Sequence, residues 1–308
     1  MYDIIGDIHG QYGKLEALLK KLNYVIKDGI WIPPNGRKAV FLGDLIDRGP
    51  DQIKVMATVK KMLENGHAHC ILGNHELNAI GYATPHPNRP GEYLRPHTDK
   101  NRIQHQEFLE AVVEGSEFHL KVVKWLQTLP VYLELDGIRV VHAWWHEPYL
   151  QELQRHGVKD GILEDHHIVW ALDKQRKHAL YDVLEGLCKG LEIKLPENIA
   201  FTDNSGIIRR DARTKWWLPE ATYMHQIALM GGEVPIDLYG QLIPKAFNPE
   251  PISGKPVFIG HYWMSGKPSV LTPKVACVDY SAGKRGPLVA YRWNGESLLN
   301  DDGFVASH

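Results

Sequence analysis

A series of short apolar runs constrains the fold of this 308-residue chain most strongly, because each run ends at one or more residues of the types glycine, aspartate, asparagine and histidine. The runs are rich in β-branched residues and do not alternate with polar ones, which is typical of strands buried on both faces. Between several of them the apolar period becomes helical. Strands that alternate with helices predict an α/β core, with the polar groups gathered beyond the carboxyl ends of the strands. The predicted strands are residues 2–5, 39–42, 70–72, 138–141 and 257–259, and the predicted helices lie around 15–22, 56–63 and 120–129.

The composition is that of a globular protein, with 44% hydrophobic and 23% charged residues. Three cysteines (Cys70, Cys188 and Cys277) lack any C-x-x-C spacing, so we expect buried thiols rather than a disulfide framework. The net charge of −2 argues against a nucleic-acid partner. The N-terminus does not resemble a signal peptide and no window of 18 apolar residues occurs, so we expect a cytoplasmic protein that does not contact a membrane.

Two stretches lack the regular order of strands and helices. Residues 81–118 begin with a segment rich in proline and histidine, and residues 146–255 contain helical patches and aromatic clusters. We interpret both as insertions that cover one face of the core. The predicted organisation is therefore a single domain over residues 1–308.

The residues that follow the predicted strands supply carboxylate, imidazole and amide side chains. Oxygen and nitrogen donors without thiolates suit Mn, Fe or Zn. Six candidate ligands, gathered from five strand ends, are more than one ion normally takes, which favours a site for two metal ions. The segments concerned are Gly6-Asp7-Ile8-His9-Gly10, Gly43-Asp44-Leu45-Ile46-Asp47-Arg48-Gly49, Gly73-Asn74-His75-Glu76, Val141-His142-Ala143 and Gly260-His261.

With these motifs, GDxHG, GDxxDRG and GNHE followed by two isolated histidines, the sequence resembles calcineurin-like metallophosphoesterases of the phosphoprotein-phosphatase branch. The resemblance covers about the first 145 residues and resumes around residues 260–293. It implies an α/β (α+β) fold built as a four-layer αββα sandwich, in which two mixed sheets are flanked by helices. It also implies a dinuclear metal site at the carboxyl ends of the strands.

The resemblance further implies which residues bind two divalent or trivalent metal ions (Mn, Fe or Zn). Asp7 and His9 would bind the first ion and Asp44 would bridge both, while Asn74, His142 and His261 would complete the second. A hydroxide between the ions would attack phosphorus in line with the leaving group.

The remaining roles follow from the same motifs. His75 would be the general acid that protonates the leaving oxygen, with Asp47 orienting its ring. Arg48 and Asn74 would bind phosphate oxygens. A second phosphate-binding arginine is expected between the two late histidines, and three candidates stay open: Arg209, Arg210 and Arg213.

The predicted activity is metal-dependent hydrolysis of a phosphate monoester or phosphoanhydride. Leu72 before GNHE and the His142-Ala143-Trp144 sequence depart from eukaryotic-type protein phosphatases. The pattern is more similar to bacterial PrpE-like phosphatases and symmetrical dinucleoside-tetraphosphate hydrolases. The substrate is therefore left open among a phosphorylated small molecule, a dinucleotide and a phosphoprotein. The alternative from another class is a catalytically inactive scaffold that binds phosphate.

Overall fold

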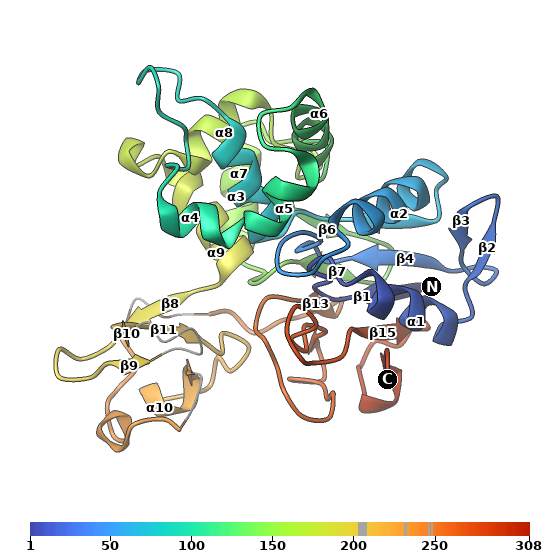
Figure 1. The fold of residues 1–308 in the computed structure, drawn as a ribbon. Helices are drawn as coiled ribbons and strands as arrows, with labels where there is room; N and C mark the ends of the chain where they lie inside the picture. The colour runs from blue at the N-terminus through green and yellow to red at the C-terminus, as the bar shows by residue number, and fades with distance from the viewer. Residues whose placement is uncertain (203–207, 231–232, 246, 248) are drawn as a thin grey trace.

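The structure is a computed structural model that describes residues 1–202, 208–230, 233–245, 247 and 249–308 (Figure 1). Its larger sheet has five strands in the order β16-β15-β1-β4-β5. The strands β1, β4 and β5 run parallel, and β15 and β16 add antiparallel strands beside β1. This sheet is therefore mixed. Its strands are β1 (Tyr2–Ile5), β4 (Lys38–Phe41), β5 (Ala68–Cys70), β15 (Val289–Trp293) and β16 (Phe304–Ala306).

A second mixed sheet has the order β14-β13-β7-β6, with β14, β13 and β7 parallel and β6 antiparallel to β7. One buried cluster contains Ile4 and Val40 of the first sheet together with Val140 and Phe258 of the second. Because side chains alternate across a strand, the neighbouring residues of β1 and β4 belong to the other, larger cluster. The second sheet consists of β6 (Tyr132–Glu134), β7 (Arg139–Val141), β13 (Val257–Ile259) and β14 (Val275–Cys277).

Helices supply the apolar side chains of that larger cluster. In α1 (Tyr12–Lys21) the stripe of Leu15, Leu18 and Leu19 is fully buried. In α2 (Gln52–Glu64), Val55 and Val59 are buried in the same way. These spacings are those of one helix face packed on a sheet.

Further helices lie together on one side of the sheets, at the top of Figure 1. The helix α6 begins where the Ser116 side chain accepts a hydrogen bond from the backbone N–H of His119. These helices are α3 (Asn74–Ala83), α4 (Asp99–Gln104), α5 (Gln106–Val112), α6 (Glu117–Leu126), α7 (Glu147–Arg155), α8 (Asp165–Leu172) and α9 (Ala179–Lys189).

Small sheets and short helical turns complete the described elements. β2 (Val25–Lys27) pairs with β3 (Ile30–Ile32), and β9 (Phe201–Thr202) with β10 (Ile208–Arg209). A three-stranded sheet joins β8 (Glu192–Lys194), β11 (Asp211–Thr214) and β12 (Ala228–Leu229). The helix α10 is Met224–Ile227, and 3₁₀ turns are η1 (Lys174–Arg176), η2 (Ile236–Leu238) and η3 (Asp301–Gly303).

The predicted fold class is confirmed. Each predicted strand overlaps an observed one, but the strand predicted over 70–72 lies at Ala68–Cys70 and shares only Cys70 with the prediction. The three predicted helical periods overlap α1, α2 and α6. The α/β (α+β) class with two mixed sheets flanked by helices is the observed architecture.

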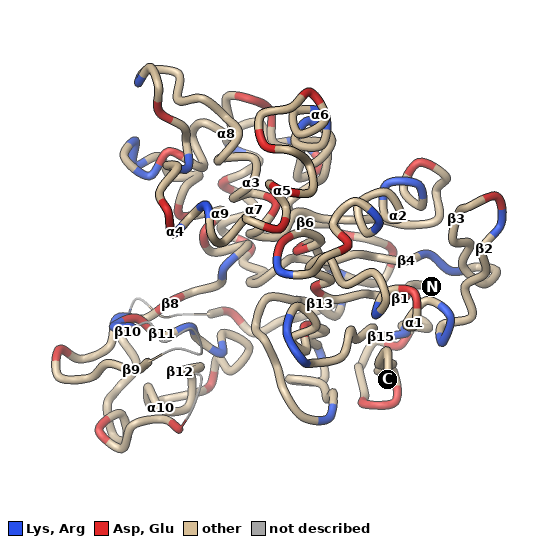
Figure 2. The backbone as a smooth tube through the Cα atoms, viewed as in Figure 1, with Lys and Arg blue, Asp and Glu red and all other residues tan. Residues whose placement is uncertain are grey.

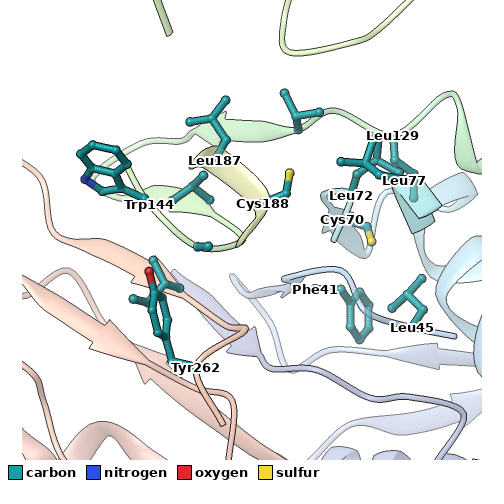
Figure 3. Close-up of a cluster of buried hydrophobic side chains, with 14 of the residues drawn as sticks. Phe41, Leu45, Cys70, Leu72, Leu77, Leu129, Trp144, Leu187, Cys188 and Tyr262 are labelled. Atoms are coloured by element: carbon teal, nitrogen blue, oxygen red, sulfur yellow. The ribbon is translucent and has the colours of Figure 1, made fainter. Parts of the chain in front are cut away.

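The cysteines are all free and buried, as expected. Figure 3 shows Cys70 and Cys188 among apolar side chains such as Phe41, Leu72 and Leu187. They act as small apolar residues there. In the described part of the chain, no helix combines the length and the apolar character needed to cross a membrane.

Candidate metal centre and active site

The polar residues that follow the parallel strands of both sheets lie at one site. Asp7 follows β1, Asp44 follows β4, and Asn74 begins α3 after β5. His142 follows β7 and His261 follows β13. All five side chains are buried, between 0 and 9% exposed. The topology thus brings together five of the six residues predicted as metal ligands. The sixth, His9, contacts Asp44.

Asp44 lies at the centre of this site. Its Oδ2 is 3.6 Å from Nε2 of His9, and its Oδ1 is 3.5 Å from Nε2 of His142. Two groups of potential metal ligands have atoms within 4.8 Å of one another, and Asp44 belongs to both. One contains His9, Asp44 and His75, and the other Asp44, His142 and His261. A carboxylate shared by two donor groups is the arrangement that a pair of cations needs.

Asn74 and Asp7 lie beside these groups. Oδ1 of Asn74 is 2.8 Å from Nδ1 of His261 and 3.2 Å from Nε2 of His142. Oδ2 of Asp7 accepts a hydrogen bond of 3.1 Å from the backbone N–H of His261. All six predicted ligands therefore lie in one buried cluster.

Several of their donor atoms have no protein partner. Oδ1 of Asp7 and Nε2 of both His9 and His261 are buried without a hydrogen bond. A buried polar atom without a hydrogen bond is costly, so such atoms favour the binding of a ligand at this site. Carboxylate oxygen and imidazole nitrogen are also the donors that transition metals prefer. The cluster therefore fits metal ions.

Hydrogen bonds orient the rings of His9 and His142 for metal binding. Nδ1 of His9 is 2.9 Å from the carbonyl oxygen of Ile46, and Nδ1 of His142 is 2.6 Å from that of Leu42. An Nδ1–H that donates to a carbonyl leaves the lone pair of Nε2 directed into the site. Burial and the neighbouring Arg48 lower the pKa of His9 to about 3, so its ring is neutral and able to bind a metal.

The backbone at the site adopts a strained conformation. The left-handed region is occupied by Asp44, at φ +47°, and by His261, at φ +67°. Such angles persist where the surroundings enforce them and are common at functional sites. Glycine is required next to the ligands, because a Cβ atom at Gly73 would come within 2.2 Å of Oδ1 of Asp44.

Glu76 stabilises this strained loop. Its buried carboxylate accepts hydrogen bonds from the backbone N–H groups of Asp44 (2.7 Å), Leu45 (2.8 Å) and Gly73 (2.9 Å). Burial and the nearby Asp44 carboxylate raise the pKa of Glu76 to about 7. The last residue of GNHE thus positions the Asp44 loop.

His75 and Asp47 form the predicted pair. Nδ1 of His75 lies 2.5 Å from Oδ2 of Asp47, and the ring is 13% exposed. Burial lowers the pKa of His75, but the carboxylates of Asp44 and Asp47 outweigh this effect, so the pKa is raised. A second histidine, His105, places its Nδ1 2.8 Å from the same oxygen. His105 lies between α4 and α5, and no feature of its own sequence segment indicated this contact.

Arginines approach the site from two sides. Nη2 of Arg48 is 3.5 Å from Nε2 of His75. Among the three late arginines, Arg213 in β11 donates a 3.4 Å hydrogen bond to the carbonyl oxygen of His261. Arg210 instead donates to the carbonyl oxygen of Glu197, and Arg209 is exposed in β10. The positions of these three arginines therefore favour Arg213 as the candidate for the second phosphate-binding arginine.

A third group of potential ligands, Glu164, His166 and His167, lies at the start of α8. Both ring nitrogens of His167 already have partners: Nδ1 accepts from the backbone N–H of Glu164, and Nε2 lies 2.9 Å from the carbonyl oxygen of His156. His167 therefore caps α8 and has no nitrogen left for a metal.

Known proteins are similar to part of this sequence. The tetraphosphatase PrpE [asymmetrical] of Oceanobacillus iheyensis is 35% identical over 141 residues, which are 46% of this chain and 54% of that protein. PrpE of Halalkalibacterium halodurans is 45% identical over 145 residues, 46% of this chain and 56% of that protein. A symmetrical bis(5'-nucleosyl)-tetraphosphatase of Photorhabdus laumondii is 43% identical over 93 residues, 30% of each chain. The chain thus matches about half or less of the length of these curated relatives.

A solved structure supports the fold. The cold-active protein-tyrosine phosphatase of a Shewanella species superposes with a TM-score of 0.51 at 18% identity, covering 100% of this chain and 80% of that one. The calcineurin-like phosphoesterase family matches residues 2–196, well over half of the sequence. The predicted resemblance is confirmed, and the chain belongs to the calcineurin-like phosphoesterase family.

Proposed function

We propose that this protein is a metal-dependent hydrolase of phosphate monoesters or phosphoanhydrides. The observation that carries the proposal is the position of Asp44, shared by two groups of potential metal ligands. The buried donor atoms without partners on Asp7, His9 and His261 support the same conclusion. Membership of the phosphoesterase family agrees with it.

Two metal ions are proposed, with Asp44 between them. Asp7 and His9 would bind one, and Asn74, His142 and His261 the other. When bound, two such cations supply Lewis acidity toward water and toward phosphoryl oxygens. The donor set of oxygen and nitrogen accepts Mn, Fe or Zn.

The protein's own residues would then bind the substrate and move the proton. Arg48 and Arg213 present guanidinium groups suited to two phosphate oxygens. Asp47 fixes the ring of His75 through Nδ1, which leaves Nε2 to donate a proton. As the bond from phosphorus to the leaving oxygen breaks, that proton passes to the oxygen, so the leaving group departs as a neutral alcohol or as a protonated phosphate.

Within this activity, a dinucleoside polyphosphate is the proposed substrate rather than a phosphoprotein. The support comes from the relatives, which are named as asymmetrical and symmetrical bis(5'-nucleosyl)-tetraphosphatases.

Turnover of p-nitrophenyl phosphate tests the activity. We expect hydrolysis with added Mn²⁺, loss of hydrolysis after chelation, and recovery when Mn²⁺ is returned. A phosphate-binding scaffold without catalytic activity would show no turnover above background in any of the three states. Hydrolysis that persists through chelation would exclude the metal-dependent mechanism.

A further inference from the structure

Three cations surround the ring of Trp263, two residues after His261. The guanidinium carbon of Arg48 lies 4.7 Å from the ring centroid, that of Arg213 lies 5.5 Å away, and Nζ of Lys284 lies 4.6 Å away. A tryptophan face attracts a cation within about 6 Å. One ring thus gathers positive groups from three distant segments, and we refer to Trp263, Arg48, Arg213 and Lys284 as the cation cluster.

The cluster adjoins the metal centre. Arg48 contacts His75, and Arg213 contacts the carbonyl of His261, as described above. Lys284 follows Gly283, where a Cβ atom would come within 2.6 Å of the His9 ring. All three cations therefore lie next to residues of the proposed catalytic site.

The backbone that carries Trp263 is held by a hydrogen bond to Asp279. Trp263 adopts a left-handed conformation at φ +50°. Its backbone N–H donates a 2.8 Å hydrogen bond to Oδ2 of Asp279, whose Oδ1 accepts from the N–H of Ser281. Because Asp279 is buried and already accepts these bonds, it anchors the loop on which Trp263 stands.

The cations lack anionic partners of their own. Across the described ranges, no carboxylate lies within ion-pair distance of Arg48, Arg213 or Lys284. Asp279 and Glu192 act on the arginines only at longer range. Three like charges around one ring repel each other, and an anion between them relieves the repulsion.

A single scissile phosphate accounts for the two arginines but not for Lys284. Lys284 also lines an open cavity of about 730 Å³ with Met264, Tyr280 and Arg285. Lys284 therefore belongs both to the cation cluster and to the lining of this cavity. A substrate that extends beyond the scissile phosphate has room to continue there.

We propose that Lys284, placed by Trp263, binds the phosphate next to the scissile one, so that the site selects substrates with at least two linked phosphates. This inference rests on the proposed function and specifies its substrate class. Lys284 would be a specificity-determining residue, since it contacts the second phosphate and not the reacting atoms.

AMP and ADP test the proposal, because they differ by one phosphate and share the same base. Each is measured as a competitive inhibitor of Mn²⁺-dependent p-nitrophenyl phosphate hydrolysis, at a fixed concentration of free Mn²⁺. The wild-type protein should bind ADP more tightly than AMP by about fivefold or more, as expected for an added charge-assisted contact at a partly exposed site. Lys284→Gln should bring the ratio of the two inhibition constants close to one.

Two further variants separate the loss of the Lys284 contact with the second phosphate from general effects on the protein. Trp263→Leu should lower the ratio as well, because it removes the ring that places Lys284. Lys267→Gln removes an exposed lysine from the same part of the chain and should leave the ratio unchanged. An equal affinity of the wild-type protein for AMP and ADP, or a ratio that survives Lys284→Gln, would overturn the inference.

Failure of the proposed function gives a different result. In that case the wild-type protein hydrolyses no p-nitrophenyl phosphate with Mn²⁺. The ratio of AMP and ADP affinities is then measured by calorimetry on the Mn²⁺-loaded protein, with the same expected and contrary outcomes.

Discussion

Nδ1 of His105 lies 2.8 Å from Oδ2 of Asp47, and Nδ1 of His75 lies 2.5 Å from the same oxygen. Asp47 is fully buried. His105 is 1% exposed and belongs to the junction of α4 and α5, a segment without a metal-ligand motif. The carboxylate that contacts the proposed proton donor is thus also in close contact with a second buried histidine.

We predict that His105→Ala lowers kcat on an alkyl phosphate by up to about 100-fold, because a small displacement of Asp47 misplaces the His75 ring. His105→Gln keeps a donor near Asp47 and should recover part of the loss. His119→Ala removes another buried histidine from α6 and should leave kcat unchanged. A merely structural role for His105 would lower the melting temperature without separating the Ala and Gln variants in kcat.

The acid role of His75 predicts a dependence on the leaving group. His75→Ala should lower kcat by about 10²–10⁴ on an alkyl phosphate, whose leaving oxygen needs a proton. The loss should be much smaller on p-nitrophenyl phosphate, whose leaving group is stable as an anion. Steady-state kinetics on both esters check this, and equal losses would remove His75 from the role.

The stability of the larger sheet depends on a buried charge outside the site. Asp3 is fully buried in β1, and Oδ1 lies 2.9 Å from Nη2 of Arg37 and 2.9 Å from Nε of Arg292. Asp3→Ala should lower the free energy of unfolding by about 3–5 kcal/mol, because two guanidinium groups lose their shared partner.

Chemical denaturation measures this loss. Glu16→Ala breaks the exposed Glu16–Lys20 pair on α1 and should cost about 0.5 kcal/mol or less. Comparable losses for the two variants would show that the Asp3 network does not stabilise the fold beyond a surface ion pair.

The sequence predicted those features of the fold and site that are encoded locally. Short apolar runs identified the strands, and the ligands follow directly in the chain, as Asp7 follows residues 2–5. Parallel strands of one sheet place their carboxyl ends at one edge, so Asp7 after β1 and Asp44 after β4 come together without any knowledge of the segment between them.

Contacts made by the long intervening segments could not be predicted in this way. His105, at the start of α5, reaches Asp47 because α5 packs against α2 and α6, and nothing periodic in residues 81–118 specifies that packing. The choice among Arg209, Arg210 and Arg213 likewise depended on β11, whose position is set by pairing with β8 and β12. Trp263 carried no signal beyond its closeness to His261.

The central claim is that two metal ions share Asp44, and elemental analysis after reconstitution with Mn²⁺ and removal of excess metal tests it most directly. We predict about two metal ions per chain for the wild-type protein, as a dinuclear site requires, and a clear loss of bound metal for Asp44→Asn. His166→Ala, in the ligand group at the start of α8, should retain the wild-type content. A wild-type content of one ion or fewer, or a content that Asp44→Asn leaves unchanged, would contradict the account.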